Sequence, residues 1–217
     1  MIDLKYDILQ EYPVIGIDEV GRGAWAGPVY AGAAFLNYKK SSNIPKEIND
    51  SKLLNQKSRE EILEKLKNYC NLSVGVVEAK YVDKLGLQKA IFLAMEKALF
   101  NLNISKKLQD YIIIIDGNIL PKFSKKNLNV RNLVKGDTIS PSIAVASIYA
   151  KVKRDNFMKI LSKRYPQYKW DKNKGYGTKD HRLAIELYGP TQEHRLSFKP
   201  LKFLKKKHFL QHNVESD

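Results

Sequence analysis

Two short apolar runs near the start of the chain predict a pair of strands joined by a loop. Val14–Ile17 is apolar and breaks at Asp18, and Val29–Leu36 is a second run rich in alanine and valine. Short apolar runs bounded by turn residues are typical of strands. Gly21 and Gly23 lie between them and give the main chain conformational freedom there. The pattern therefore predicts two strands connected by a functional loop.

Further strands then alternate with helices along the chain. The predicted strands are Leu72–Val77, Tyr111–Ile115 and Val130–Val134. The second of these is an uninterrupted run of aromatic and β-branched residues, which is typical of a strand buried on both faces. Apolar residues at helical spacing predict helices that begin near Ser58, cover Leu87–Leu102, run from Pro141 to about Lys163, and cover Thr178–Leu187.

Two of these helices begin with recognisable capping residues. Ser58 and Glu61 have the spacing of a capping box, in which each side chain binds a main-chain N–H of the other residue. Ser140 and Pro141 offer a cap followed by a proline at the first helical position, where its missing N–H costs nothing. We therefore expect both helices to start at these residues.

A hairpin followed by alternating strands and helices is typical of an α/β fold, with a mixed sheet and helices packed on it. Beyond Tyr165-Pro166 the pattern becomes irregular, aromatic and basic. We therefore predict one domain over residues 1–165 and a basic helical region over residues 166–217, with a single continuous domain as the alternative.

The charge of the chain indicates a polyanionic partner. Its 217 residues carry a formal net charge of +15. Residues 151–217 contain 17 basic and 7 acidic residues, a net charge of +10, so the last third carries most of the excess. Such a surface attracts phosphates at long range. A lysine-rich composition without functional meaning is the plain alternative.

The chain has no feature of a membrane or secreted protein. No apolar run approaches the roughly 20 residues that span a bilayer. The first residues lack the basic and then apolar segments of a signal peptide. Cys70 is the single cysteine, which excludes an internal disulfide and fits a reducing compartment. We expect a cytoplasmic protein that does not bind membranes.

Four acidic residues stand where predicted strands end: Asp18, Glu19, Asp116 and Asp137. Carboxylates brought together would repel one another unless a divalent cation neutralised them. Mg²⁺ and Mn²⁺ prefer such oxygen ligands, and a pair of them can promote phosphodiester hydrolysis. The pattern is therefore compatible with a metal-dependent nuclease.

Each acidic residue also has an ordinary structural explanation. Neighbours on a strand point to opposite faces, so Asp18 and Glu19 share a site only if the main chain bends there. The pair alone is compatible with a solvated turn, and Asp116-Gly117 is itself a turn signal. Asp137 alone would support the start of the following helix. The acidic residues by themselves leave these alternatives open.

Six motifs follow one another along roughly residues 16–201. They are Gly16-Ile17-Asp18-Glu19-Val20-Gly21-Arg22-Gly23 with Ala26-Gly27-Pro28-Val29, Asn49-Asp50-Ser51-Lys52-Leu53, Ile114-Ile115-Asp116-Gly117-Asn118, Lys135-Gly136-Asp137 leading into Ala144–Asp155, Gly175-Tyr176-Gly177-Thr178 with His181, and Gly189-Pro190-Thr191 with His194-Arg195 and Ser197-Phe198. These motifs closely resemble those of type 2 ribonuclease H, ribonuclease HII. One such motif would be weak, but six in the family's order are highly specific.

The resemblance implies a ribonuclease H-like fold, with a mixed five-stranded sheet flanked by helices and a helical C-terminal region that helps to clasp a duplex. It implies Asp18, Glu19, Asp116 and Asp137 as the catalytic carboxylates, which bind two divalent ions, Mn²⁺ or Mg²⁺. It also implies cleavage of RNA/DNA hybrids, and of duplex DNA on the 5′ side of single embedded ribonucleotides, leaving 3′-hydroxyl and 5′-phosphate ends.

The resemblance further implies residues that recognise the substrate. The segment Gly21-Arg22-Gly23 matches the family segment that detects the 2′-hydroxyl, the group that distinguishes RNA from DNA. Glycine suits this task because the absence of a Cβ lets the main chain approach a sugar closely. Tyr176 matches the tyrosine that packs on the following deoxyribose, and Lys52 is expected to contact a phosphate. Without the surrounding motifs, a surface aromatic and a solvated lysine would be the simpler interpretations.

Four residues stay without a functional assignment. His181 and His194 lack the spacing of a zinc site, so satisfied surface or packing histidines are the expected interpretation. Ala24 stands where the family more often has proline, which predicts a slightly less rigid loop. Trp25 is expected to serve in packing, with an effect on the shape of the binding groove as the alternative.

Three rival functions have different requirements. A type 3 ribonuclease H carries an extra N-terminal domain, whereas about fifteen residues precede the first motif here. An architectural nucleic-acid-binding protein fits the charge but needs no carboxylate quartet. A metal-dependent phosphohydrolase of small molecules does not need the basic C-terminal third. We therefore expect a nuclease, with a monomer as the default state.

Overall fold

The computed structural model describes residues 5–38, 48, 54–199 and 201–203. The chain forms two compact units, each built from three segments. The sheet unit comprises Met1–Val20, Tyr30–Val76 and Ile91–Lys153, and the loop unit comprises Gly21–Val29, Val77–Ala90 and Arg154–Asp217. The division predicted at residue 165 remains a prediction, because these units are defined by compactness and draw on segments far apart in the sequence.

The sheet has five strands, as the resemblance implied. They are β1 (Val14–Val20), β2 (Val29–Leu36), β3 (Cys70–Val77), β4 (Ile112–Asp116) and β5 (Asn129–Leu133). Their spatial order is β3-β2-β1-β4-β5. β1 runs antiparallel to β2 and parallel to β4, and β4 runs parallel to β5. The sheet is therefore mixed, and all five predicted strands are present.

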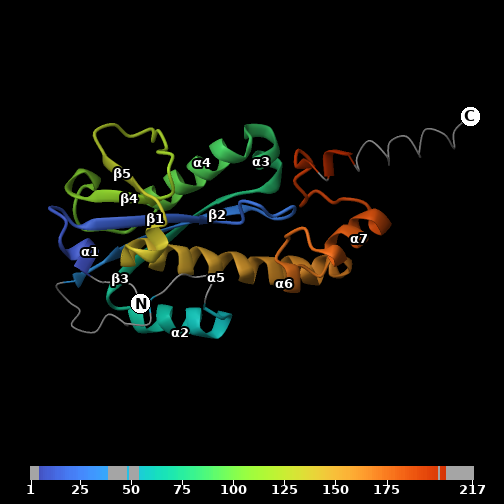
Figure 1. Ribbon diagram of the computed structural model, residues 1–217, viewed down its shortest axis with the longest axis horizontal. Helices are drawn as coiled ribbons and strands as arrows, with labels where there is room; N and C mark the ends of the chain where they lie inside the picture. Colours follow the sequence, from blue (N-terminus) through green and yellow to red (C-terminus); the bar gives the residue numbers. More distant parts are fainter. Residues whose placement is uncertain (1–4, 39–47, 49–53, 200, 204–217) are drawn as a thin grey trace, which may run out of the picture. The chain divides into compact units, whose positions relative to one another are not determined.

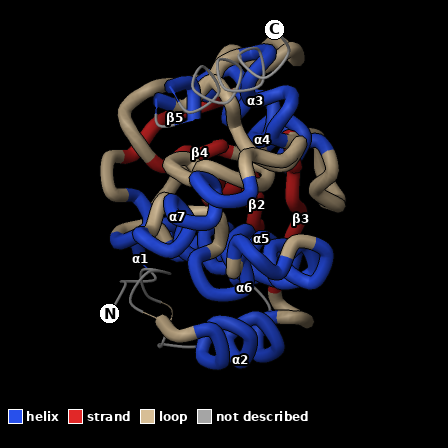
Figure 2. Tube along the Cα trace, turned by 90° about the vertical axis from the view of Figure 1, so that its right-hand side faces the viewer, coloured by secondary structure: helices blue, strands red, loops and turns tan. Residues whose placement is uncertain are grey.

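Helices cover the two faces of the sheet (Figure 1). α4 (Leu87–Phe100) lies on one face and α5 (Pro141–Arg164) on the other. β4, which lies between β1 and β5, is fully buried over its first four residues, which explains its uninterrupted apolar sequence. α2 (Gln56–Leu66) lies outside α5 (Figures 1 and 2), where its Ile62 and Leu66 pack against apolar residues of α5.

Glycines allow α5 and α4 to approach the sheet closely. A Cβ added at Gly16 or Gly32 would overlap the main chain of α5, and one added at Gly75 would overlap the main chain of α4. Gly16 lies two residues before Asp18 on β1, so both residues face α5. The glycines therefore fix the distance between α5 and the strand that carries Asp18.

The start of α5 is held by a buried carboxylate from the N-terminal segment. Asp7, in the short helix α1 (Lys5–Ile8), accepts hydrogen bonds from Ser140 Oγ at 2.7 Å and from the main-chain N–H of Ser142 at 2.9 Å. Tyr38 donates to the same carboxylate at 2.9 Å. A negative group at a helix N-terminus is favourable because it meets unpaired N–H groups and the positive end of the helix dipole.

The helix predictions are confirmed except at the start of α2. The predicted start of α5 at Pro141 is correct, and the predicted helix Thr178–Leu187 corresponds to α7 (Lys179–Tyr188). α2, however, begins at Gln56, because the side chain of Asn55 accepts a hydrogen bond from Ser58 N–H at 2.9 Å. Ser58 therefore lies within the first turn and does not form the expected capping box.

The loop unit contains helices that the periodicity did not predict, α3 (Ala79–Leu85) and α6 (Trp170–Asn173), together with α7 and the last part of α5. Its core is aromatic: Tyr168 and Trp170 are fully buried and stack with ring centres 5.0 Å apart. No helix in the described part of the chain is both long and apolar enough to cross a membrane.

We predict that Gly32→Ala destabilises the protein by about 1–3 kcal/mol, because the new methyl group overlaps the carbonyl of Ala146 in α5. Urea unfolding followed by circular dichroism measures the change. Gly23→Ala is the control, since a Cβ at Gly23 meets no atom within 4 Å. Equal stability of the two variants would contradict the close packing described here.

Candidate active site

Three of the predicted acidic residues meet at one edge of the sheet. β1 and β4 are parallel and pair Ile17 with Ile115, so Asp18 and Asp116 follow side by side on neighbouring strands. Asp137 lies in a short 3-10 helix, Gly136–Thr138, just after β5. One carboxylate oxygen from each of the three residues lies within 4.8 Å of the others.

The turn before Asp137 is shaped to bring that residue to Asp116. Lys135 adopts a left-handed conformation with φ of 56°. The N–H of Gly136 then donates to Asp116 Oδ1 at 2.6 Å. A Cβ at Gly136 would crowd the side chain of Ile143 at 2.6 Å, so glycine permits this approach. The main chain of this turn thus donates a hydrogen bond to Asp116 and places Asp137 close to it.

Burial and neighbouring charge raise the pKa of Asp18. Asp18 is only 6% exposed, and loss of hydration is the main cause of its raised pKa. The negative charges of Glu19 and Asp116 raise the pKa further, whereas a hydrogen bond with Ser147 lowers it. The charged form of Asp18 is therefore unfavourable without a compensating cation.

Glu19 neighbours the cluster but is not one of the three residues grouped around a possible ion. β1 keeps regular pairing with β2 through Val20, which pairs with Tyr30, so no extra residue interrupts the pairing at Asp18. The group of three that share a possible ion, as found among the described residues, does not include Glu19. Glu19 is half-buried, its N–H donates to Asp18 Oδ1 at 2.7 Å, and its charge raises the pKa of Asp18. It therefore lies at the edge of the cluster.

The three clustered carboxylates fit a divalent metal ion. Ligands of an octahedral Mg²⁺ lie about 2.1 Å from the ion, so their oxygens are roughly 3–4 Å apart. Carboxylate oxygens within 4.8 Å of one another need only small side-chain adjustments to reach this spacing. An all-oxygen set also suits Mg²⁺ and Mn²⁺ and disfavours softer metals. Asp18, Asp116 and Asp137 are thus the residues that could hold the ion.

The predicted ribose-sensing segment lies in the loop unit. Gly21 is buried with φ of 87°, and a Cβ there would overlap the side chain of Arg154. Arg22 and Gly23 are exposed at the tip of the loop. Farther along, the N–H groups of Trp25 and Ala26 both donate to the carbonyl of Gly175, at 2.7 and 3.2 Å. The segment is therefore exposed at its tip and anchored behind it.

Tyr176 has the accessibility that a substrate contact requires. It is 36% exposed, and its ring centre lies 5.6 Å from the guanidinium of Arg154. The ring nitrogen Nδ1 of His181 lies 2.9 Å from the carbonyl oxygen of Tyr176. The main chain of this residue is thus held from inside the unit while the side chain reaches the surface.

His181 and His194 are packing residues, as one of the two expected interpretations had it. They are 0% and 1% exposed, with their Nε2 atoms 3.1 Å apart. Trp170 donates to Nε2 of His181, and the N–H of Thr191 donates to Nδ1 of His194. Those two nitrogens must therefore be unprotonated, so His194 donates through Nε2 and His181 donates through Nδ1 to Tyr176. Burial favours this neutral arrangement, because it lowers the pKa of both histidines.

Of two further residues with a predicted role, Lys52 and Trp25, the structure describes only Trp25. Lys52, the expected phosphate contact, lies outside the described residues. Trp25 packs, as expected: its ring centre is 5.9 Å from that of His181, and a Cβ at Gly177 would overlap its indole. Trp25 therefore holds the loop against the segment that contains Tyr176.

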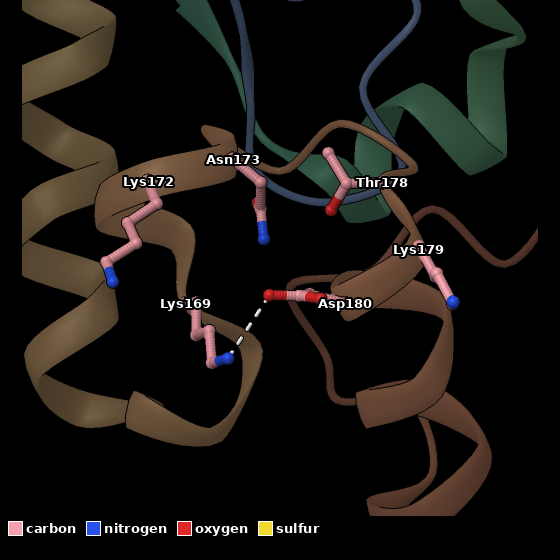
Figure 3. Close-up of a pocket in the computed structure, with 6 residues that line it drawn as sticks. All are labelled: Lys169, Lys172, Asn173, Thr178, Lys179 and Asp180. Carbon is pink, nitrogen blue, oxygen red and sulfur yellow. Dashed lines mark hydrogen bonds and ion pairs between the residues drawn. The ribbon is translucent and has the colours of Figure 1, made fainter.

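A pocket of about 370 Å³ is lined by lysines and other polar residues that are close to Tyr176 in the sequence (Figure 3). Its lining residues are Lys169, Lys172, Asn173, Thr178, Lys179 and Asp180. Lys169 forms an ion pair with Asp180 at 3.1 Å, whereas Lys179 points away from that pair (Figure 3). The basic C-terminal third thus presents cations around a hollow in the surface.

The structure also reveals residues that the sequence interpretation did not select. Ser147 binds Asp18 from α5, and the buried side chains of Arg154 and Arg195 bind carbonyls of the segment 21–28. All three lie within the quoted motifs. A lone arginine in a chain of net charge +15 offers no signal that it is buried.

Solved structures share this architecture. The crystal structure of the ribonuclease H2 from Pyrococcus horikoshii OT3 superposes with a TM-score of 0.73 and 23% identity, covering 89% of this chain and 97% of that one. The crystal structure of Bst-RNase HIII in complex with Mn²⁺ gives a TM-score of 0.69 and 20% identity, covering 91% and 70%. These likenesses establish a ribonuclease H-like fold, which confirms the predicted fold class.

Sequence comparison then identifies the family. The family model described as Ribonuclease HII matches residues 15–201. Ribonuclease HII of Ehrlichia ruminantium (strain Welgevonden) is 43% identical over 199 residues, 91% of both chains. Ribonuclease HII of Pelagibacter ubique (strain HTCC1062) is 43% identical over 186 residues, 86% of this chain and 95% of that protein. The chain belongs to the ribonuclease HII family, and it is a ribonuclease H, a hydrolase that acts on RNA/DNA hybrids.

We predict that Asp18→Asn raises the melting temperature of the metal-free protein by a few degrees. The pKa of Asp18 is raised on folding, so the folded protein binds the proton more tightly and loses stability as pH rises through the acidic range. A neutral amide removes this cost at pH 7. Differential scanning fluorimetry with and without Mn²⁺ measures the effect.

The same variant should lose the stabilisation by Mn²⁺ that the wild type shows. Asp110→Asn, a change at an exposed aspartate of the sheet unit, is the matched control and should leave both values unchanged. A metal-free melting temperature of Asp18→Asn at or below the wild-type value, with Mn²⁺ stabilisation retained, would contradict the assigned cluster.

We predict that the melting temperature of the wild type falls by a few degrees relative to that of His194→Gln as pH drops from 7 to 4.5. Burial, and then the neighbouring His181, lower the pKa of His194 to about 3. The unfolded chain therefore binds a proton below about pH 6.5 that the folded protein excludes, so this histidine lowers the stability on acidification. An identical pH dependence in both proteins would show that His194 does not carry it.

Proposed function

We propose that this protein cuts the RNA strand of RNA/DNA hybrids, and duplex DNA on the 5′ side of single embedded ribonucleotides, by two-metal-ion hydrolysis. The products carry 3′-hydroxyl and 5′-phosphate ends. The observation that carries the proposal is the meeting of Asp18, Asp116 and Asp137 within 4.8 Å at the ends of neighbouring strands. Membership of the ribonuclease HII family supplies the substrate class.

The four acidic residues have different proposed tasks. Asp18 and Asp116 stand side by side on buried strands, which makes them rigid ligands for a shared Mn²⁺ or Mg²⁺ ion. Asp137 comes from a turn and completes the set, and Glu19 at the edge of the cluster is the proposed ligand for a second ion. Bound divalent ions activate an attacking water and stabilise the departing 3′-oxygen in such sites.

Ribose recognition is proposed for the segment Gly21-Arg22-Gly23. Arg22 and Gly23 are exposed, and the main-chain groups of this segment are the candidate partners of the 2′-hydroxyl. Tyr176, whose ring reaches the surface, is proposed to pack on the next sugar. Lys52 and the lysines of the pocket in Figure 3 would add phosphate contacts without sequence preference.

The direct test uses duplex DNA that contains one ribonucleotide. Incubation with Mn²⁺ or Mg²⁺ should yield a single cut on the 5′ side of the ribonucleotide, and EDTA should abolish it. An RNA/DNA hybrid should be cut in the RNA strand, and an all-DNA duplex should remain intact. Denaturing gel electrophoresis of end-labelled strands resolves these products.

Asp116→Asn should reduce the cleavage rate by more than about a hundredfold, because a metal ligand is lost while the side chain keeps its shape. Asp110→Asn is again the matched control. Duplex binding without any cleavage by the wild type would favour an architectural protein over a nuclease. Hydrolysis of small phosphate esters alone would favour a small-molecule phosphohydrolase.

A further inference from the structure

Two arginines of the loop unit are completely buried. Arg154 and Arg195 each have 0% exposure. Burial of a guanidinium is costly unless its N–H groups find acceptors, because the ion loses its hydration. Both side chains find main-chain carbonyl oxygens in the segment 21–28. The segment proposed to read the ribose is therefore built around buried cations.

Arg195 binds the part of the segment that is proposed to detect the 2′-hydroxyl. Its Nη1 donates to the carbonyls of Gly21 at 2.7 Å and Arg22 at 3.1 Å, and its Nε donates to the carbonyl of Gly27 at 3.0 Å. Its own main-chain N–H donates to the carbonyl of Trp25 at 2.8 Å. One residue thus binds both arms of the loop, at its start and at its end.

These bonds fix the direction of the neighbouring N–H groups. In a planar trans peptide, the C=O and the following N–H point in opposite directions. Because the carbonyls of Gly21 and Arg22 point toward the guanidinium, the N–H groups of Arg22 and Gly23 point away from it. Those two N–H groups belong to the exposed tip of the loop. They are the donors that a 2′-oxygen of a bound ribose can accept from.

A guanidinium suits this position better than an ammonium group. Its planar fork offers several donors in fixed directions, whereas lysine offers a compact and strongly hydrated charge on a flexible stem. The cost of burial is visible in the lowered pKa of Arg195, about 9, caused first by lost hydration and then by the charge of Arg154. The Nη2 atom of Arg195 is also buried without a hydrogen-bond partner. Arg195 is therefore buried in the loop unit despite a considerable desolvation cost.

Arg195 is itself held in place by an acidic residue of α3. Asp83 accepts hydrogen bonds from the N–H groups of Leu196 at 2.7 Å and Ser197 at 3.0 Å. On the other side of Arg195, His194 forms a β-bridge with Ala26. The main chain on both sides of the arginine is thus anchored within the same unit.

We propose that Arg195 is a positioning residue that sets the preference of the enzyme for a ribose. It orients the peptide planes of Gly21–Arg22 and Arg22–Gly23, so that their N–H groups face the 2′-oxygen of the substrate. This inference rests on the proposed function of the Gly21-Arg22-Gly23 segment and adds the residue that shapes it.

Arg154 provides the matched control. It is equally buried, lies in the same unit, and also donates to three main-chain carbonyls, those of Pro28, Ala26 and Lys174. None of these three carbonyls belongs to residues 21–23. The Arg154 atoms nearest to Gly21 are Nε, Cδ and Cζ, of which lysine retains Cδ. Arg154→Lys therefore removes a comparable buried guanidinium without removing a hydrogen-bond donor from the carbonyls of Gly21 and Arg22.

The experiment compares two duplexes that differ at one sugar, a ribonucleotide or a 2′-fluoro nucleotide at the same position. Fluorine is a much weaker acceptor than a hydroxyl oxygen, so the ratio of single-turnover cleavage rates reports the 2′ contact. Arg195→Lys should slow ribonucleotide cleavage by roughly tenfold, the value of about one hydrogen bond. Its rate on the 2′-fluoro duplex should stay within about twofold of the wild type.

Arg154→Lys should keep the wild-type ratio within about twofold, whatever its effect on stability. In both variants the stabilisation by Mn²⁺ should equal that of the wild type, because the carboxylates are unchanged. If Arg195→Lys does not fold, Arg195→Gln takes its place. Glutamine has no charge to desolvate and can donate to one of the two carbonyls, so it should also lower the ratio.

The assignment of Arg195 would be overturned if Arg195→Lys slowed cleavage of both duplexes equally, so that the ratio of the two rates stayed unchanged. It would also be overturned if Arg154→Lys changed this ratio to the same extent. A wild-type enzyme that cuts at the ribonucleotide but shows no preference over 2′-fluoro would instead refute ribose recognition by the segment. A wild-type enzyme that does not cut either duplex would refute the proposed function itself. The three failures are therefore distinguishable.

Discussion

Carboxylates at the ends of β1 and β4 repel one another, and the fold around them holds them together against that repulsion. Parallel pairing forces Asp18 and Asp116 side by side, and a turn held by Asp116 itself brings Asp137 to them. Burial adds to the cost by raising the pKa of Asp18. Gly16 and Gly32 let α5 approach the sheet closely, and Ser147 of α5 forms a hydrogen bond with the carboxylate of Asp18. The fold therefore maintains an arrangement of carboxylates that a bound cation makes favourable at neutral pH.

The loop unit shows the opposite electrostatic situation. There the buried charges are cations, Arg154 and Arg195, and the oxygens that stabilise them are main-chain carbonyls. Carbonyl dipoles that point inward leave N–H groups that point outward, which is the polarity needed to bind the oxygens of a nucleic acid. The buried ring of His181, which contacts His194 through Nε2, holds the carbonyl of Tyr176 in the same way through Nδ1. Side chains inside the unit thus orient the main chain that meets the substrate.

The sequence predicted the elements well because apolar runs and helical spacing are local properties. β2 begins and ends as predicted, and α5 begins at Pro141 as expected. The start of α2 was wrong because Asn55 and Ser58 are both acceptable caps and three residues separate them. The family motifs selected the acidic residues, but only the register of β1 and β4 shows which of them meet, and Glu19 lies at the edge of the group. The role of Arg195 could not be predicted, since burial of an arginine depends on tertiary contacts between segments more than 160 residues apart.

Anomalous diffraction from a crystal grown with Mn²⁺ would locate the metal in the protein. We expect a manganese peak coordinated by carboxylate oxygens of Asp18, Asp116 and Asp137, about 2.1 Å from each bound oxygen. The peak should be absent from crystals of Asp116→Asn grown under the same conditions. If manganese bound elsewhere in the same crystal but not at these residues, the three carboxylates would not be the metal site.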